Sequence, residues 1–202
     1  MNNLTFKQYR NIDLSIFALL VILSEAITTV ATNSWFVAQP VAISTTIIFV
    51  CILMMRWGAF AIIHAIIGGV VFCVASGASV EHFIIYSVGN CLTMCALLWF
   101  KLLGKERVRT DSFVLAIYTV SVYLLMQVGR WLVSLFFGGG LGELVGYITT
   151  DIISLLFAVV IMLILRKTDG MIEDQKAYLF RLERERLEEQ QSSSYGGYGS
   201  ED

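Results

Sequence analysis

Charge and proline are scarce in this chain. Of its 202 residues only 15% are charged, one is proline and 57% are hydrophobic, which gives a mean hydropathy of +0.75. A soluble domain carries about 25% charged residues, so this composition excludes a soluble globular protein of this size. The net charge of −2 says little about partners, because the charges are segregated along the chain. We therefore predict an integral membrane protein.

The sequence also lacks the signatures of catalytic and metal sites. It contains no Gly-rich phosphate loop ending in Gly-Lys-Ser/Thr, no HExxH and no GxSxG. All four cysteines lie in apolar runs, and the two with ligand-like spacing, Cys91 and Cys95, have no His or further Cys at their depth. We expect no enzyme, metal site, cofactor, disulfide framework or nucleic-acid partner. Uphill transport would need another subunit or an ion gradient as its energy source.

Six stretches are apolar enough to be membrane-spanning helices. A span needs roughly 17–25 mostly apolar residues, because its backbone groups must bond internally in lipid. The predicted spans are 13–32, 40–55, 57–76, 82–103, 112–137 and 143–165. The second is the shortest, and Pro40 suits its first turn. The first lacks a small-residue cleavage site and is too long for a signal peptide, so we expect it to stay attached.

The chain changes character after Arg166. We predict a six-helix membrane domain over residues 1–166, a charged cytoplasmic helix over 167–191 and a disordered tail over 192–202. The charged helix has a narrow apolar strip formed by Ile172, Leu179 and Leu182. It is either a solvated extension or a handle for a cytosolic partner. The predicted fold class is an all-α, six-transmembrane-helix bundle with a short cytoplasmic C-terminal helix.

Basic residues occur at alternate connections between the spans. Loops 33–39, 77–81 and 138–142 contain none, whereas the other connections and the flanking segments hold Lys7, Arg10, Arg56, Lys101, Lys105, Arg107, Arg109, Arg166 and Lys167. Lys and Arg in short loops remain cytoplasmic. We therefore predict a multi-pass protein of the cell membrane with both termini in the cytoplasm. Arg130 is the exception, because it lies inside the fifth span.

Arg130 belongs to a layer of polar residues at one depth. Counted at 1.5 Å per residue, Arg130 lies about 10 Å from the outer end of its span, and Glu25, Asn90 and Asp151 lie ~10–12 Å from theirs. Polar and small side chains recur at three- and four-residue spacing on the same faces, including Tyr123 and Gln127 on the fifth span and Tyr147 on the sixth. Such faces meet a protein interior or a wet cavity, not lipid.

Two interpretations of this layer compete. In the first, Arg130 reaches the outer headgroups or forms a structural clamp with Glu25 or Asp151. In the second, the layer lines an outward-facing cavity that holds a small solute, either a zwitterion or a neutral polar molecule with one basic group. Aromatic residues of loop 33–39 stand at its mouth, where they also suit a belt at the membrane interface. The candidate substrate-binding residues are Glu25, Trp35, Asn90, Tyr123, Gln127, Arg130, Tyr147 and Asp151.

The third span carries a face of small residues. Gly58, Ala61, Ala65 and Gly68 follow one another at three- and four-residue spacing, which lets another helix approach closely. This face is a candidate docking surface for a partner protein, and internal packing is the alternative.

The chain resembles the substrate-binding S components of energy-coupling factor (ECF) transporters. The resemblance covers about residues 12–166 and rests on size, six spans, cytoplasmic termini, the outer polar layer, the aromatic loop after the first span and the stretch MRWGAFAIIHAIIGGVVFCVASGAS. It implies vitamin or micronutrient uptake and docking onto a transmembrane scaffold subunit with ATPase subunits. The clearest small-residue face lies on the third span here, whereas that group has it on the first. Membrane lipid and a small-molecule substrate complete the expected partners.

A structural membrane protein of the cell envelope, similar to the rod-shape determinant MreD, is the second hypothesis. In that case the polar layer holds the helices together, and the charged C-terminal helix is the part that binds partner proteins.

Overall fold

The computed structural model describes residues 5–37, 41–168 and 170–195. Over these ranges it is helical and contains no strand, which confirms the all-α prediction. The helices are α1 (Phe6–Trp35), α2 (Thr46–Trp57), η1 (Gly58–Phe60), α3 (Ala61–Ser76), α4 (Val80–Gly89), η2 (Asn90–Leu97), α5 (Leu98–Leu103), α6 (Lys105–Thr110), α7 (Ser112–Ser134), η3 (Leu135–Phe137), α8 (Leu141–Thr150), α9 (Ile152–Leu165) and α10 (Gln175–Tyr195). Pro40 and residues 196–202 of the tail predicted over 192–202 lie outside the described residues, while residues 192–195 belong to α10.

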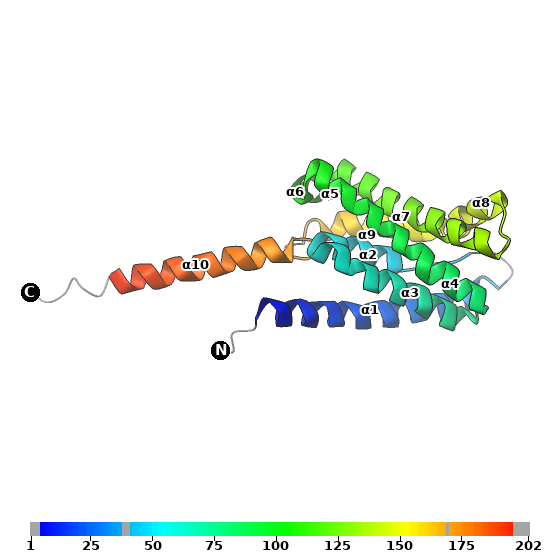
Figure 1. The fold of residues 1–202 in the computed structure, drawn as a ribbon, viewed down its shortest axis with the longest axis horizontal. Coiled ribbons are helices and arrows are strands. Elements are labelled where there is room, and N and C mark those ends of the chain that lie inside the picture. The colour runs from blue at the N-terminus through cyan, green and yellow to red at the C-terminus, as the bar shows by residue number, and fades with distance from the viewer. Residues whose placement is uncertain (1–4, 38–40, 169, 196–202) are drawn as a thin grey trace, which may run out of the picture.

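The helices form an elongated bundle from which α10 projects at one end (Figure 1). The start of α1, the end of α2 and the start of α10 meet there, because the Phe6 ring contacts both Trp57 and Phe180. We call this the basic end, since Arg56 and Lys105 also lie there, bonded to Gly170 and Asp174. The opposite end, the loop end, contains the connections α1–α2, α3–α4 and α7–α8 (Figure 1).

Apolar side chains cover much of the outer surface of the bundle. Leu19, Leu23 and Ile27 on α1 and Leu156 on α9 are each about three-fifths exposed or more. In water such a surface would be an aggregation liability, whereas in lipid it faces a matching solvent. The structure is therefore compatible with a membrane protein.

Four helical stretches are long and apolar enough to cross a membrane, and the bent pair α8 and α9 makes a fifth. Thr46–Ser76 counts as one of the four, although the sequence predicted two spans there, 40–55 and 57–76. The chain turns at Gly58, whose φ is +64°, and α2 packs against α3. With 12 residues α2 is shorter than a span. Six spans are therefore not confirmed.

The extended backbone before α2 explains its short length. Residues 41–44 have no helical assignment, and two of their amide groups bond to other parts of the chain. The Ala42 amide donates to the Thr150 carbonyl at 2.9 Å, and the Ser44 amide donates to the Ser154 hydroxyl at 2.8 Å. A non-helical segment at this depth is tolerated only when its polar groups are satisfied by protein.

Glu25 on α1 caps the N-terminus of α2. Its Oε2 atom accepts hydrogen bonds from the backbone amides of Thr45 and Thr46, at 2.8 and 2.9 Å, and from both of their hydroxyl groups at 2.9 Å. The first amides of a helix have no intrahelical partner, and the helix dipole favours a negative group there. This contact therefore fixes where α2 begins.

Helices α4 and α7 approach each other at two glycines. A Cβ on Gly129 would lie 2.0 Å from the Gly89 carbonyl oxygen, and a Cβ on Gly89 would lie 2.6 Å from the Arg130 backbone. No side chain fits at either position, so the two backbones touch. This contact sets the position of Arg130, the residue next to Gly129.

Candidate functional site

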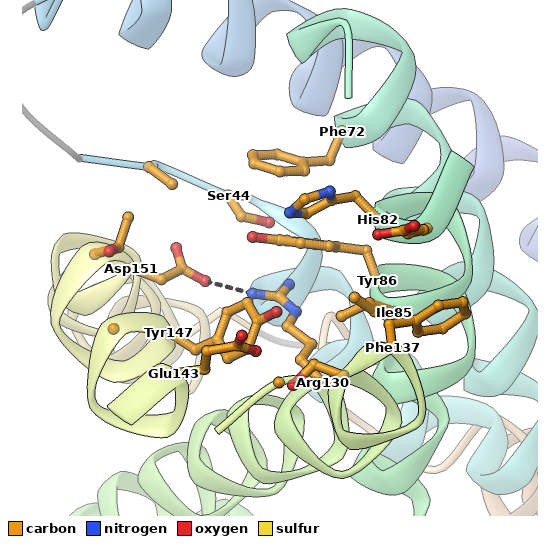
Figure 2. Close-up of a pocket in the computed structure, with 16 residues that line it drawn as sticks. Ser44, Phe72, His82, Ile85, Tyr86, Arg130, Phe137, Glu143, Tyr147 and Asp151 are labelled. Atoms are coloured by element: carbon orange, nitrogen blue, oxygen red, sulfur yellow. Dashed lines mark hydrogen bonds and ion pairs between the residues drawn. The ribbon is translucent and has the colours of Figure 1, made fainter. Parts of the chain in front are cut away.

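A cavity of about 350 Å³ opens at the loop end of the bundle (Figure 2). We call it the Arg130 pocket. Helices α3, α4, α7 and α8 and the extended segment before α2 all contribute to its wall. Its lining residues are Ala42, Ser44, Phe72, Glu81, His82, Ile85, Tyr86, Arg130, Ser134, Phe137, Gly139, Glu143, Gly146, Tyr147, Thr150 and Asp151.

Arg130 lies at the inner side of this pocket and is 3% exposed. Its Nε donates to Asn90 Oδ1 at 2.9 Å, and its Nη1 donates to Gln127 Oε1 and Asp151 Oδ2, both at 3.1 Å. Gln127 in turn donates to the same Asp151 oxygen at 3.0 Å. Three helical segments, η2, α7 and the α8–α9 bend, are thereby joined through one guanidinium.

The second terminal nitrogen of Arg130 has a weaker partner. Among the described residues Nη2 donates to the Met126 sulfur at 3.2 Å, and a thioether is a weak acceptor. The guanidinium carbon also lies 4.3 Å from the centre of the Tyr86 ring. Arg130 is therefore a structural clamp through Nε and Nη1, and it retains donor capacity at Nη2.

Aromatic rings form one wall of the pocket. Phe72 and Tyr86 stack with ring centres 4.8 Å apart and planes inclined by 16°, and His82 lies 6.3 Å from Tyr86. Figure 2 shows these three rings layered beside the Arg130 guanidinium. The Tyr147 ring on α8 lies edge-on to the Tyr86 ring, with the ring centres 6.2 Å apart. Such a wall binds flat apolar groups and the faces of organic cations.

Acidic groups outnumber basic ones around this cavity. Glu81, Glu143 and Asp151 line it together with Arg130 and His82. Asp151 is paired with Arg130, and the two glutamates stand nearer the loop end, at the starts of α4 and α8. The mouth of the pocket is therefore acidic, and its floor holds the guanidinium.

Asp151 stands at the break between α8 and α9, which are bent by 49°. Its side chain accepts from Arg130 and Gln127 through one oxygen and from the Ser154 hydroxyl through the other. Broken helices of this kind place unpaired helix ends beside ligand sites in membrane transport proteins. The break also turns α8 across the pocket, so Glu143 and Tyr147 face Arg130 (Figure 2).

The structure brings together part of the predicted substrate-binding set. Arg130, Tyr147 and Asp151 line the pocket, while Asn90 and Gln127 lie behind them and hold the Arg130 and Asp151 side chains. These five residues form one connected site.

The other three predicted residues lie elsewhere. Tyr123 donates its hydroxyl to the Ile148 carbonyl and lines neither described cavity. Trp35 is 79% exposed at the end of α1, away from the lining. Glu25 caps α2 and does not line the pocket. Its depth matches that of Arg130, but its carboxylate is directed to a different helix end.

The sequence-based prediction missed the aromatic wall. Tyr86 lies four residues before Asn90 and Phe72 lies four residues after Gly68, so both follow helical faces that were already identified. One more helical turn along each face toward the loop end would have found them. His82 lies on the same face as Tyr86, four residues earlier.

The candidate docking face lies inside the bundle. Ala61, Ala65 and Gly68 are buried, and α3 packs against α1, α2, α4 and η2. A Cβ on Gly68 would lie 2.1 Å from the Thr46 hydroxyl, and the Ala65 carbonyl accepts from Asn90. Gly58 sits at the α2–α3 turn. The close approach that this face permits is made by helices of the same chain.

Comparison with protein-family models, curated proteins and solved structures found no match. The resemblance to ECF S components therefore rests on the sequence features described above.

Proposed function

We propose that this protein binds a small zwitterionic solute in the Arg130 pocket, as the membrane-embedded capture component of an uptake system. The observation that carries this proposal is the convergence of three features on one cavity of about 350 Å³. They are a guanidinium with a weak partner at Nη2, two glutamates without an ion pair among the described residues, and an aromatic wall. Ligand sites typically combine apolar walls with a few placed polar groups.

The position of the charges suggests the chemistry of the guest. An anionic group of the solute fits Arg130 Nη2, where a charge-assisted hydrogen bond is strengthened by burial. A cationic group fits the acidic mouth formed by Glu81 and Glu143. An apolar or aromatic part between them packs on Tyr86. A zwitterion with a flat ring can interact with all three parts of the pocket. A dianion would be repelled by the carboxylates at the mouth.

The wider role follows the resemblance to ECF S components. In this proposal the loop end faces outward in the cell membrane and both termini are cytoplasmic, in agreement with the basic residues at the opposite end. The chain has no sequence motif for ATP hydrolysis, so a scaffold subunit with ATPase subunits would supply the energy.

Native mass spectrometry of the purified protein, followed by calorimetric titration with zwitterionic aromatic solutes, tests the proposal. We expect a co-purified or added solute whose affinity falls by about 10-fold or more in Tyr86→Ala and in Glu143→Gln. Glu183→Gln on α10, which is exposed and far from the pocket, is the matched control. Equal affinities in all three variants would contradict the proposal.

A structural scaffold is the second candidate function. It is favoured by the observation that Arg130 already bonds Asn90, Gln127 and Asp151, as a clamp between helices requires. In that case Tyr86→Ala changes stability only, and no solute is retained. Co-purification of envelope proteins that depends on α10 would support it.

A further inference from the structure

A second cavity of about 280 Å³ lies beside the Arg130 pocket. We call it the Thr29 cavity. Phe72 and Tyr86 belong to the walls of both cavities, as do Ala42 and Thr150. Its lining is otherwise formed by α1 and by the extended segment before α2, namely Thr29, Thr32, Asn33, Val41 and Ile43.

Thr29 differs from the other hydroxyl residues in its half of α1. Ser24, Thr28, Thr32 and Ser34 each donate to the carbonyl four residues earlier, at 2.6 to 2.8 Å. Thr29 makes no such bond, and its Oγ1 has no partner among the described residues although the side chain is 1% exposed. A buried hydroxyl without a partner is costly, so this oxygen is directed to something other than its own helix.

Glu25 lies one helical turn before Thr29 on the same face and has a similar unpaired atom. Oε2 accepts all four hydrogen bonds from Thr45 and Thr46, and the Ser44 side chain also lies beside the carboxylate. Oε1 itself has no hydrogen-bond partner among the described residues, and the residue is 0% exposed. A proton on Oε1 would create a donor with no acceptor. A bare carboxylate oxygen would leave buried charge uncompensated. A small cation bound to the deprotonated oxygen would compensate this charge.

We propose that Glu25 Oε1 and Thr29 Oγ1 bind a sodium ion that enters through the Thr29 cavity. Residues four apart on a helix are neighbours, so the two oxygens share one face of α1, with Thr29 lining the cavity and Glu25 one turn further along the helix, outside the lining. Carboxylate, hydroxyl and water oxygens are the ligands of hard cations. Non-helical backbone supplies carbonyl ligands for sodium in broken-helix transporters, and Val41–Ile43 is such a backbone in the cavity wall.

This site is independent of whether the Arg130 pocket binds a solute. It would add an ion dependence that an ATP-driven capture subunit does not require.

The full-length protein in detergent tests the proposal through thermal unfolding in sodium, potassium or choline chloride at equal ionic strength. Saturating sodium is expected to raise Tm by about 5 °C over choline, because a ligand that binds only the folded state stabilises it. Thr29→Val, which removes the oxygen and keeps the side-chain shape, should lose most of this shift. Thr28→Val, one residue away, should keep it.

Radioactive sodium binding to the same variants gives a second readout, with Glu25→Gln added. We expect saturable binding in the wild type and in Thr28→Val, and at least 10-fold weaker binding in Thr29→Val and Glu25→Gln. Absence of a sodium-specific shift in the wild type would overturn the proposal, as would an undiminished shift in Thr29→Val. The solute titration is carried out in choline chloride, so its outcome is separate.

Discussion

Removal of the Arg130 guanidinium should destabilise the fold through the charge it leaves behind. In Arg130→Ala the Asp151 carboxylate keeps its bonds from Gln127 and Ser154 but loses its ion pair. The side chains of this pair are 4% and 6% exposed, so Arg130→Ala removes a buried partner of the carboxylate. Breaking a buried pair on one side typically costs about 3–5 kcal/mol of the free energy of unfolding. We expect a loss in this range.

The double mutant Arg130→Ala, Asp151→Asn separates the uncompensated charge from the lost contacts. Asparagine has no charge to compensate, and its oxygen can still accept from Gln127. We therefore expect the second change to restore about 0.5–3 kcal/mol, which is the coupling range for residues in direct contact. The measurement is reversible unfolding in mixed micelles, with all four members of the cycle compared.

The ion pair Arg181–Glu173 is the control, because Arg181 is 57% exposed and such pairs couple weakly. Its cycle should show little coupling. Additive effects of the Arg130 and Asp151 changes, with coupling below about 0.5 kcal/mol, would refute the argument that this pair holds the α8–α9 bend in place. A stable double mutant would also allow solute binding to be measured without a folding defect.

Three further changes follow from the packing and the charge distribution. Gly129→Ala should lower the free energy of unfolding by about 1–3 kcal/mol because its Cβ meets the α4 backbone, whereas Gly142→Ala on α8 meets no atom within 4 Å and should raise this free energy by about 0.4–1 kcal/mol, both measured by chemical denaturation. Ala65→Leu should reduce folded protein in size-exclusion chromatography, since Ala65 is fully buried; a folded variant that lost only a partner would contradict this. Reporter fusions in loop 138–142 and after Thr110 should lie on opposite sides of the membrane, and equal reporter activity would refute the proposed orientation.

The polar layer could be inferred from the sequence because depth in a helix is a simple count. Arg130, Asn90 and Asp151 were expected at one level, and the structure places their side chains within hydrogen-bonding distance. The same count placed Glu25 at that level, but its partner is the start of α2. Hydropathy does not indicate that α2 begins only at Thr46, because Val41–Ile43 is apolar and is therefore predicted to be part of the helix.

The break between α8 and α9 at Asp151 could not be predicted from the sequence for a related reason. Neither glycine nor proline stands at that position, and residues 143–165 form one apolar run. The helix ends there in a structure where Asp151 bonds to Arg130 on α7 and to Ser154 on α9. Such a break depends on tertiary contacts rather than on local preference. The pocket wall formed by Glu143 and Tyr147 depends on it as well.

Helix α2 connects two distant parts of the molecule as a rigid rod. It is 12 residues long, about 18 Å, and most of its side chains are buried. At its far end Arg56 is paired with Asp13 and donates to the carbonyls of Gly170 and Met171, which lead into α10. At the other end of α2, the backbone amides of Thr45 and Thr46 donate hydrogen bonds to the Glu25 carboxylate. A displacement of α10 would therefore act on the same helix whose other end adjoins the segment that lines the Thr29 cavity, so α2 links the two ends of the bundle mechanically.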